Sequence, residues 1–200
     1  IKNTKISISP NPINTSLKEI SNYDAESTSV VFAGRLVQTK GVEEILEIWE
    51  RIDTKNLTLE IIGSSSEKNK LSEKYSSKNI KFLGELSNND VKRKINSARA
   101  VITATKLFEG QPRVLLEASS FGVPSIYPNF GGMNDFFPSN YRLSFKQFNY
   151  DDLEQKIMML HDSKLLSHES KEIKKHLMTN YSDKFLYENF KNILNSEENE

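Results

Sequence analysis

Short apolar runs alternate with helix-like segments about six times along this chain of 200 residues. The runs have the length and composition of buried strands, and they span residues 30–33, 57–62, 80–84, 100–104, 123–127 and 141–145. Strands that alternate with helices form parallel sheets, because each helix carries the chain back across the sheet before the next strand begins. The pattern therefore predicts an α/β fold with a doubly wound, parallel, six-stranded, Rossmann-like sheet.

The segments between the runs carry helix signals. Helices are expected after Gly41, at residues 67–77, after the polar cap at 87–90 and from Pro112, whose fixed φ suits a first helical residue. Three more helices are expected to end the chain, at residues 152–161, 164–181 and 183–195. These helices supply the crossover connections that a parallel sheet requires.

Residues 105–127 form a strand-end, turn, helix and strand unit, in which Gly110 allows a tight turn before the helix. The first amide groups of that helix have no partners within it, so they suit an anion. In the strand order 3-2-1-4-5-6, the loops after the first and fourth strands are neighbours. Arg35 and Lys40 lie in the first of these loops and Glu109 begins the second. We expect these side chains to meet at one crevice.

Each charged residue of this crevice has two explanations. Arg35 and Lys40 suit a diphosphate, with a planar fork and a point charge, but they would also fit as two solvated loop cations. Glu117 could accept both hydroxyls of a ribose, or form an ion pair with Arg113 one helical turn before it. Glu109 is either an acid near the positive end of the helix or a carboxylate that holds sugar hydroxyls.

The composition excludes several classes of function. The chain has 27 Lys and Arg and 27 Asp and Glu, so no general attraction to nucleic acid is expected. It has no cysteine, and its three histidines lack the spacing of metal ligands, so neither a metal site nor a cofactor is predicted. No apolar run reaches the roughly 18 residues of a membrane span. Cytoplasm is compatible with this composition.

Taken together, these motifs resemble the C-terminal, donor-binding half of a GT-B glycosyltransferase of family 4, the glycosyl transferases group 1. The spacing of Glu109 and Glu117 is that of the family's E-x7-E motif. The other matching stretches are residues 31–36 with 40–41, 61–63, 82–84, 109–118, 122–124 and 131–132. Any one stretch would be weak, but the combination is specific and extends over about residues 9–195.

The resemblance implies a retaining, metal-independent hexosyltransferase that needs no cofactor. Its catalytic residues would be Arg35, Lys40 and Glu109, of which the two cations would stabilise the leaving nucleotide and Glu109 would contact the transferred sugar. Glu117 would take the ribose hydroxyls. The remaining donor-binding residues would be Gly34, Gly110, Gln111, Pro112, Arg113 and Val114 around the phosphates and Phe82, Leu83 and Glu85 around the base. A UDP-sugar is favoured over a GDP- or ADP-sugar.

The resemblance also implies a domain plan. Residues 1–15 would be an interdomain crossover, residues 16–182 the nucleotide-sugar-binding domain, and residues 183–200 a C-terminal helix that packs on an N-terminal acceptor-binding domain. That domain is not in this sequence, so we expect a piece of a longer protein that transfers little sugar alone. The acceptor would be a glycan or a lipid-linked glycan in polysaccharide or glycolipid synthesis. The enzyme would be cytoplasmic, with any contact to the inner membrane face made through the missing half.

Some positions depart from the family pattern, and other functions stay open. Gln111 stands where Phe is usual, and Ser64 begins a serine run where a second glycine is usual, so the donor sugar is not identified. The alternatives are another GT-B-like enzyme, such as a UDP-sugar 2-epimerase, or a non-catalytic phosphate- or nucleotide-binding module. A receiver module needs acids after its first strand, where this chain has Gly34 and Arg35.

Overall fold

A computed structural model describes residues 23–64 and 68–195. Its six strands form one sheet in the order β3-β2-β1-β4-β5-β6, and every neighbouring pair is parallel. The strands are β1 (Ser29–Ala33), β2 (Thr58–Ile62), β3 (Ile80–Gly84), β4 (Ala100–Ile102), β5 (Ser125–Pro128) and β6 (Ser144–Phe145). The predicted fold class is confirmed, and the strand order is the one on which the predicted crevice depends. The predicted crossover at residues 1–15 lies outside the described residues.

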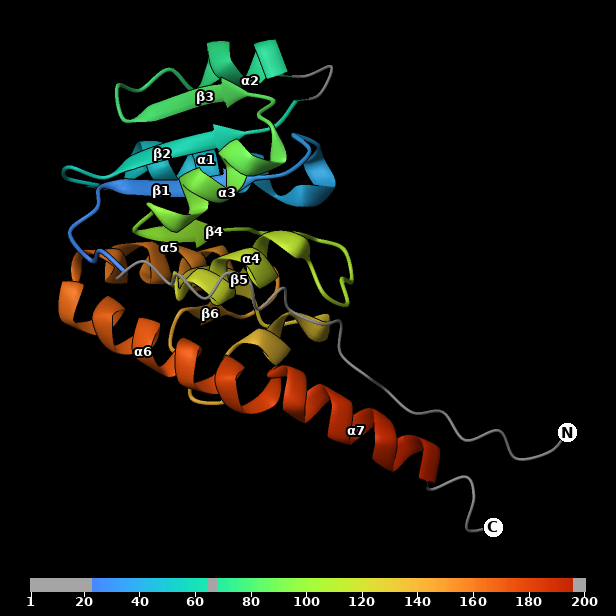
Figure 1. Cartoon of the computed structure of the whole chain (residues 1–200). Helices are drawn as coiled ribbons and strands as arrows, with labels where there is room; N and C mark the ends of the chain where they lie inside the picture. The colour runs from blue at the N-terminus through green and yellow to red at the C-terminus, as the bar shows by residue number, and fades with distance from the viewer. Residues whose placement is uncertain (1–22, 65–67, 196–200) are drawn as a thin grey trace, which may run out of the picture.

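Helices cover both faces of this sheet (Figure 1). The elements are η2 (Gln38–Lys40), α1 (Val42–Arg51), α2 (Lys68–Lys74), α3 (Asn88–Asn96), α4 (Arg113–Phe121), η3 (Gly131–Phe136), α5 (Tyr150–Met158), η4 (Met159–His161), α6 (Ser163–Asn180) and α7 (Asp183–Asn195). Helices α1 and α5 lie on one face, where Arg51 and Glu154 join them by an ion pair. Helices α3, α4 and α6 lie on the other face.

The core follows from the apolar pattern of the sequence. All three residues of β4 are buried, as expected for a central strand with helices on both faces. Helix α1 buries one apolar stripe, which consists of Val42, Ile45, Leu46, Ile48 and Trp49. Helices on both faces of the sheet therefore hold β1 and β4 in place up to their carboxyl ends.

Several predicted boundaries were wrong. Strand β6 begins at Ser144 rather than at residue 141, because the Tyr141 hydroxyl bonds to the backbone of Ser125, 2.6 Å from its nitrogen and 2.8 Å from its oxygen. Strand β4 ends at Ile102 and α2 at Lys74, both earlier than predicted. An apolar run reports burial, whereas strand pairing requires a partner at the right register.

The start of α4 also differs from the prediction. Pro112 was predicted to be the first residue of α4, but its ψ of 126° is extended and it is the N-cap instead. Its carbonyl oxygen accepts hydrogen bonds from the amides of Leu115 and Leu116, both at 3.1 Å. The helix therefore begins at Arg113, so its first free amide groups lie one residue later than expected.

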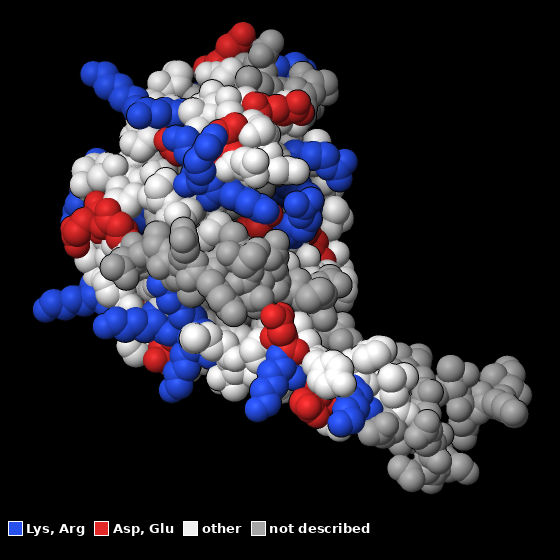
Figure 2. Space-filling model, in the orientation of Figure 1, with Lys and Arg blue, Asp and Glu red and all other residues white. Residues whose placement is uncertain are grey.

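Helix α7 ends the described part of the chain. Its bounds agree with the predicted helix at 183–195, and it exposes the large side chains Phe185, Tyr187, Phe190 and Leu194. Among the described residues, no helix is both long and apolar enough to cross a membrane. The face of the molecule in Figure 2 carries both basic and acidic side chains, in keeping with a formal net charge of zero.

Candidate functional site

The crevice lies where the strand order reverses. Strands β1 and β4 pair directly, with Val30 opposite Ala100 and Val31 opposite Val101. Because the strands are parallel, the loops that follow them leave the sheet at the same edge. The backbone amide of Lys106 in the second loop donates to the Thr39 carbonyl in the first, at 2.8 Å. The sheet thus brings together two loops that are far apart in the sequence.

The larger cavity at this edge has a volume of about 470 Å³. It lies between the ends of β1, β2 and β3 and the start of α4. Six residues that were predicted to bind the donor line it, namely Gly34, Arg35, Glu85, Arg113, Val114 and Glu117. Its other lining residues include Gly63, Ser64, Leu86, Asn88 and Val91. Its size is within the usual range of ligand pockets, about 300–1,000 Å³.

A smaller cavity of about 50 Å³ adjoins the first and shares Ala33, Gly34 and Val114 with it. Lys40 and Glu109 both line this smaller cavity, and Lys40 Nζ lies 2.7 Å from Glu109 Oε1. The two side chains are 23% and 21% exposed. The structure therefore brings these two predicted catalytic residues into direct contact, in a recess beside the larger cavity.

The start of α4 separates the two cavities. No side chain caps this helix start, and its first turn has no acidic residue. Glu117 is 17% exposed and lies 3.6 Å from Arg113, whose side chain is 75% exposed. The carboxylate is therefore held near the cavity wall by a loose pair, while free amide groups and the positive end of the helix dipole favour an anion beside it.

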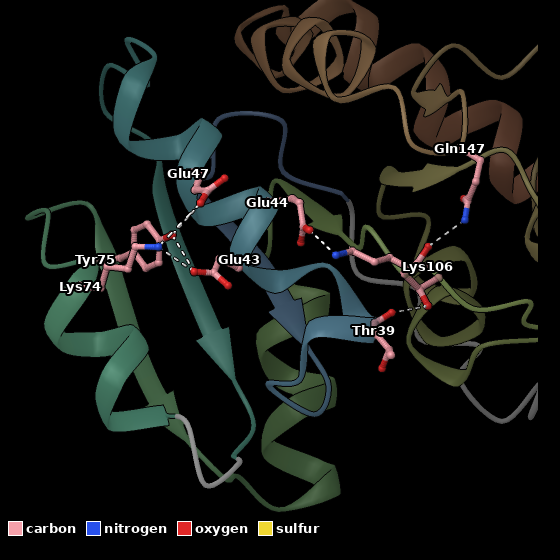
Figure 3. Close-up of polar contacts among 9 residues, drawn as sticks. Thr39, Glu43, Glu44, Glu47, Lys74, Tyr75, Lys106 and Gln147 are labelled. Atoms are coloured by element: carbon pink, nitrogen blue, oxygen red, sulfur yellow. Dashed lines mark hydrogen bonds and ion pairs between the residues drawn. The ribbon is translucent and has the colours of Figure 1, made fainter.

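A brace that sequence reasoning missed holds the loop before Glu109 (Figure 3). The Lys106 ammonium pairs with the Glu44 carboxylate on α1, and this hydrogen bond raises the pKa of Lys106. The Gln147 side-chain amide donates to the Thr105 carbonyl at 3.4 Å. The brace ties the loop to α1 and to the segment between β6 and α5. The only sequence signal for it was the position of Lys106 shortly after β4.

The other side of that loop packs against η3. The amide of Gly132 donates to the Glu109 carbonyl at 2.9 Å, so the backbone of Glu109 is fixed. Phe108 and Phe130 meet edge to face with their ring centroids 5.5 Å apart, and they are 72% and 40% exposed. The backbone of Glu109 is thus held by η3 as well as by the brace.

Not every predicted site residue reaches the two cavities. Phe82 and Leu83 lie in β3 with partly buried side chains, and neither lines either cavity. Leu86 and Asn88, which follow β3 in the chain, line the larger cavity instead. Gly110 and Gln111 belong to the connection between Glu109 and Pro112, and they do not line either cavity. Pro112 lines the smaller one.

The histidines lie away from the crevice, as predicted. His161 is in η4, where partial burial lowers its pKa, and His176 Nε2 lies 2.8 Å from the Asp135 carbonyl oxygen. Within residues 23–64 and 68–195, no group of three or more His, Cys, Asp or Glu side chains could hold a metal ion. The charged chemistry of the described crevice therefore rests on its Lys, Arg and Glu side chains.

Comparisons with known proteins agree on one family. The family model described as "Glycosyl transferases group 1" matches residues 14–177. The amylovoran biosynthesis glycosyltransferase AmsD of Erwinia amylovora is 31% identical over 121 residues, which are 60% of this chain and 34% of AmsD. The chain therefore spans about a third of the length of this curated relative.

Solved structures share the fold at low sequence identity. TarM of S. aureus, solved with UDP, has a TM-score of 0.73 at 20% identity, over 96% of this chain and 38% of TarM. The lipopolysaccharide outer core galactosyltransferase WaaB has a TM-score of 0.73 at 23% identity, over 96% of this chain and 56% of WaaB. Anabaena HepE, solved with UDP-glucose, has a TM-score of 0.70 at 15% identity, over 91% and 51%.

Proposed function

The chain belongs to the glycosyl transferases group 1 family, and on this premise we propose that it is the nucleotide-sugar-binding domain of a retaining, metal-independent glycosyltransferase. The transferase would act in polysaccharide or glycolipid synthesis, with a UDP-sugar as its donor. The observation that carries the proposal is the cavity of about 470 Å³, which gathers Arg35, Glu117 and the start of α4 at the reversal point of the sheet.

The diphosphate would lie between Arg35 and the start of α4. An Arg guanidinium binds phosphate oxygens through two parallel N–H donors, and a helix start offers free amides and a positive dipole end. Lys40, five residues after Arg35, would reach the terminal phosphate from the smaller cavity. Negative charge builds up on the departing diphosphate during transfer, so two cations and a helix start can do there what a divalent ion does elsewhere.

Glu117 would bind the ribose. Its carboxylate is mostly buried at the cavity wall, and its partner Arg113 is exposed and 3.6 Å away. A carboxylate presents two acceptor oxygens to the two neighbouring hydroxyls of a ribose, and such charge-assisted bonds are stronger than neutral ones. The base would then lie toward Glu85, Leu86 and Asn88, which line the same cavity.

Glu109 would accept hydroxyls of the transferred sugar in the smaller cavity. The acceptor would be a glycan or lipid-linked glycan held by an N-terminal domain, and α7 would pack on that domain through its exposed aromatic side chains. Sugar transfer would therefore belong to the whole protein, and donor binding to this chain.

Isothermal titration calorimetry of the 200-residue chain with UDP, GDP and ADP tests the proposal. We expect all three to bind weakly and UDP most tightly. The matched control is Glu154→Gln, which removes an acid from an ion pair on the far helix α5 and should leave binding unchanged. Absence of binding by all three nucleotides would refute the proposal.

A further inference from the structure

Lys40 and Glu109 neutralise each other at the point where the terminal phosphate of the donor would lie. They come from loops 69 residues apart in the sequence and are 2.7 Å from each other. Both side chains are about four-fifths buried. Any phosphate that reaches Lys40 therefore meets the Glu109 carboxylate at the same time.

We propose that Glu109 makes the site discriminate against the nucleoside diphosphate product and in favour of the nucleotide-sugar donor, because its carboxylate competes with a free terminal phosphate for Lys40. The proposal rests on the proposed function, since it assumes that Lys40 receives the terminal phosphate. It adds to Glu109 a role in product release that is separate from contact with the sugar.

The two ligands differ in charge where they meet Glu109. A phosphate with a free terminus has its second pKa near 6, so it carries between about −1.5 and −2 at pH 7. The same phosphate in a nucleotide sugar is esterified to the sugar and carries a single negative charge. A terminal phosphate with more negative charge depends more on the Lys40 ammonium, and this dependence is strong where little water screens the charges. Glu109 holds that ammonium in a largely buried pair, so the product loses more to the competition than the donor does.

The sugar also changes what Glu109 can do. Its hydroxyls donate to the Glu109 carboxylate, so the group that competes with the product for Lys40 becomes a group that binds the donor. Lys40 has three N–H donors, so it can contact Glu109 and a singly charged phosphate together. The Gly132 amide holds the Glu109 carbonyl at 2.9 Å, so the backbone of Glu109 is fixed beside Lys40.

The test measures the affinity of the full chain for UDP and UDP-glucose by calorimetry. Glu109→Gln keeps the size of the side chain and removes its charge. We expect it to bind UDP about tenfold more tightly than the unchanged chain, while UDP-glucose binds no more tightly than before. If Glu109 served only to position Lys40, its loss would weaken both ligands. Glu154→Gln again controls for net charge.

A second pair of variants tests whether Lys40 carries the effect. In a Lys40→Gln background, Glu109→Gln should change UDP affinity less than threefold, because the competition is already removed. UDP binding that is unchanged or weaker in Glu109→Gln, or an equal gain in both backgrounds, would overturn the inference and leave the proposed function standing. Failure of UDP, GDP and ADP to bind any variant would refute the proposed function instead.

Discussion

The two ion pairs of the crevice are built in different ways. Lys40 and Glu109 belong to separate loops, lie 2.7 Å apart and are almost equally buried. Arg113 and Glu117 are one turn apart on α4, lie 3.6 Å apart and differ widely in exposure, at 75% and 17%. The first pair is held between two loops of the fold, whereas the second is a looser contact between an exposed cation and a mostly buried acid.

This difference predicts different roles for the loops around Lys40 and for the region around Glu117. The loops around Lys40 are tied to each other and to α1, so changes there should cost stability. Glu117 has an exposed partner that a ligand can displace at little cost, since exposed ion pairs contribute about 0–1 kcal/mol. Changes around Glu117 should therefore cost binding. The predictions below test this contrast in order of decreasing effect.

The largest effect is expected at Gly41, beneath Lys40. Its φ is 67°, and a Cβ at this position would lie far inside contact distance of the Ala104 carbonyl oxygen. Gly41→Ala should lower the free energy of unfolding by about 3 kcal/mol or more, because the strained backbone and the clash add together. Urea unfolding followed by circular dichroism measures it.

The matched control is Gly110→Ala in the neighbouring loop. A Cβ there meets nothing within 4 Å, and the residue does not have a positive φ. The change should stay within about 0.5 kcal/mol. Equal losses in the two variants would show that the close approach of Gly41 to Ala104 does not determine the stability of these loops.

The second prediction concerns binding at Glu117. Glu117→Ala should weaken UDP binding by about 2 kcal/mol and Arg35→Ala by about 1–2 kcal/mol, as expected for charged hydrogen bonds. Arg113→Ala should cost less than about 0.5 kcal/mol, because its side chain is largely exposed and its amide remains. Calorimetry measures all three. A loss at Arg113 as large as at Glu117 would mean that the two residues act as one unit.

Much of the fold could be predicted because burial and helical periodicity are local properties of the sequence. Six apolar runs were enough for the sheet, and the glycine and charged residues after the first and fourth strands located the crevice. The ends of strands were harder, since pairing depends on distant partners. Tyr141 is apolar enough to resemble a strand residue, but its hydroxyl is used to bond the Ser125 backbone.

Most of the residues predicted for the site line one of the two cavities, but most of the contacts between them were not predicted. The spacing of Arg113 and Glu117 predicts that they pair. No local sequence pattern predicts that Lys40 contacts Glu109 or that Lys106 contacts Glu44. Two other side chains that line the larger cavity were missed for the same reason. Leu86 and Asn88 reach it from beyond β3, after the chain has turned toward α3.

The smallest effect is expected at the Lys106–Glu44 brace. Lys106→Met should lower the free energy of unfolding by about 1 kcal/mol, since the partly buried Glu44 loses its partner. Folding raises the pKa of Lys106 above its ordinary value of 10.5. The contribution is therefore complete below pH 10.5 and is lost as pH rises through the folded-state pKa, because the unfolded chain loses this proton first.

The difference in unfolding free energy between the unchanged chain and Lys106→Met should thus be constant from pH 7 to 9 and shrink above pH 10.5. Denaturation curves at each pH measure it, and a double variant with Glu44→Gln isolates the pair. UDP affinity at pH 7 should change less than about threefold, because neither Lys106 nor Glu44 lines either cavity. A large loss of affinity would mean that the brace, and not the Lys40 loop alone, sets where Glu109 meets the donor.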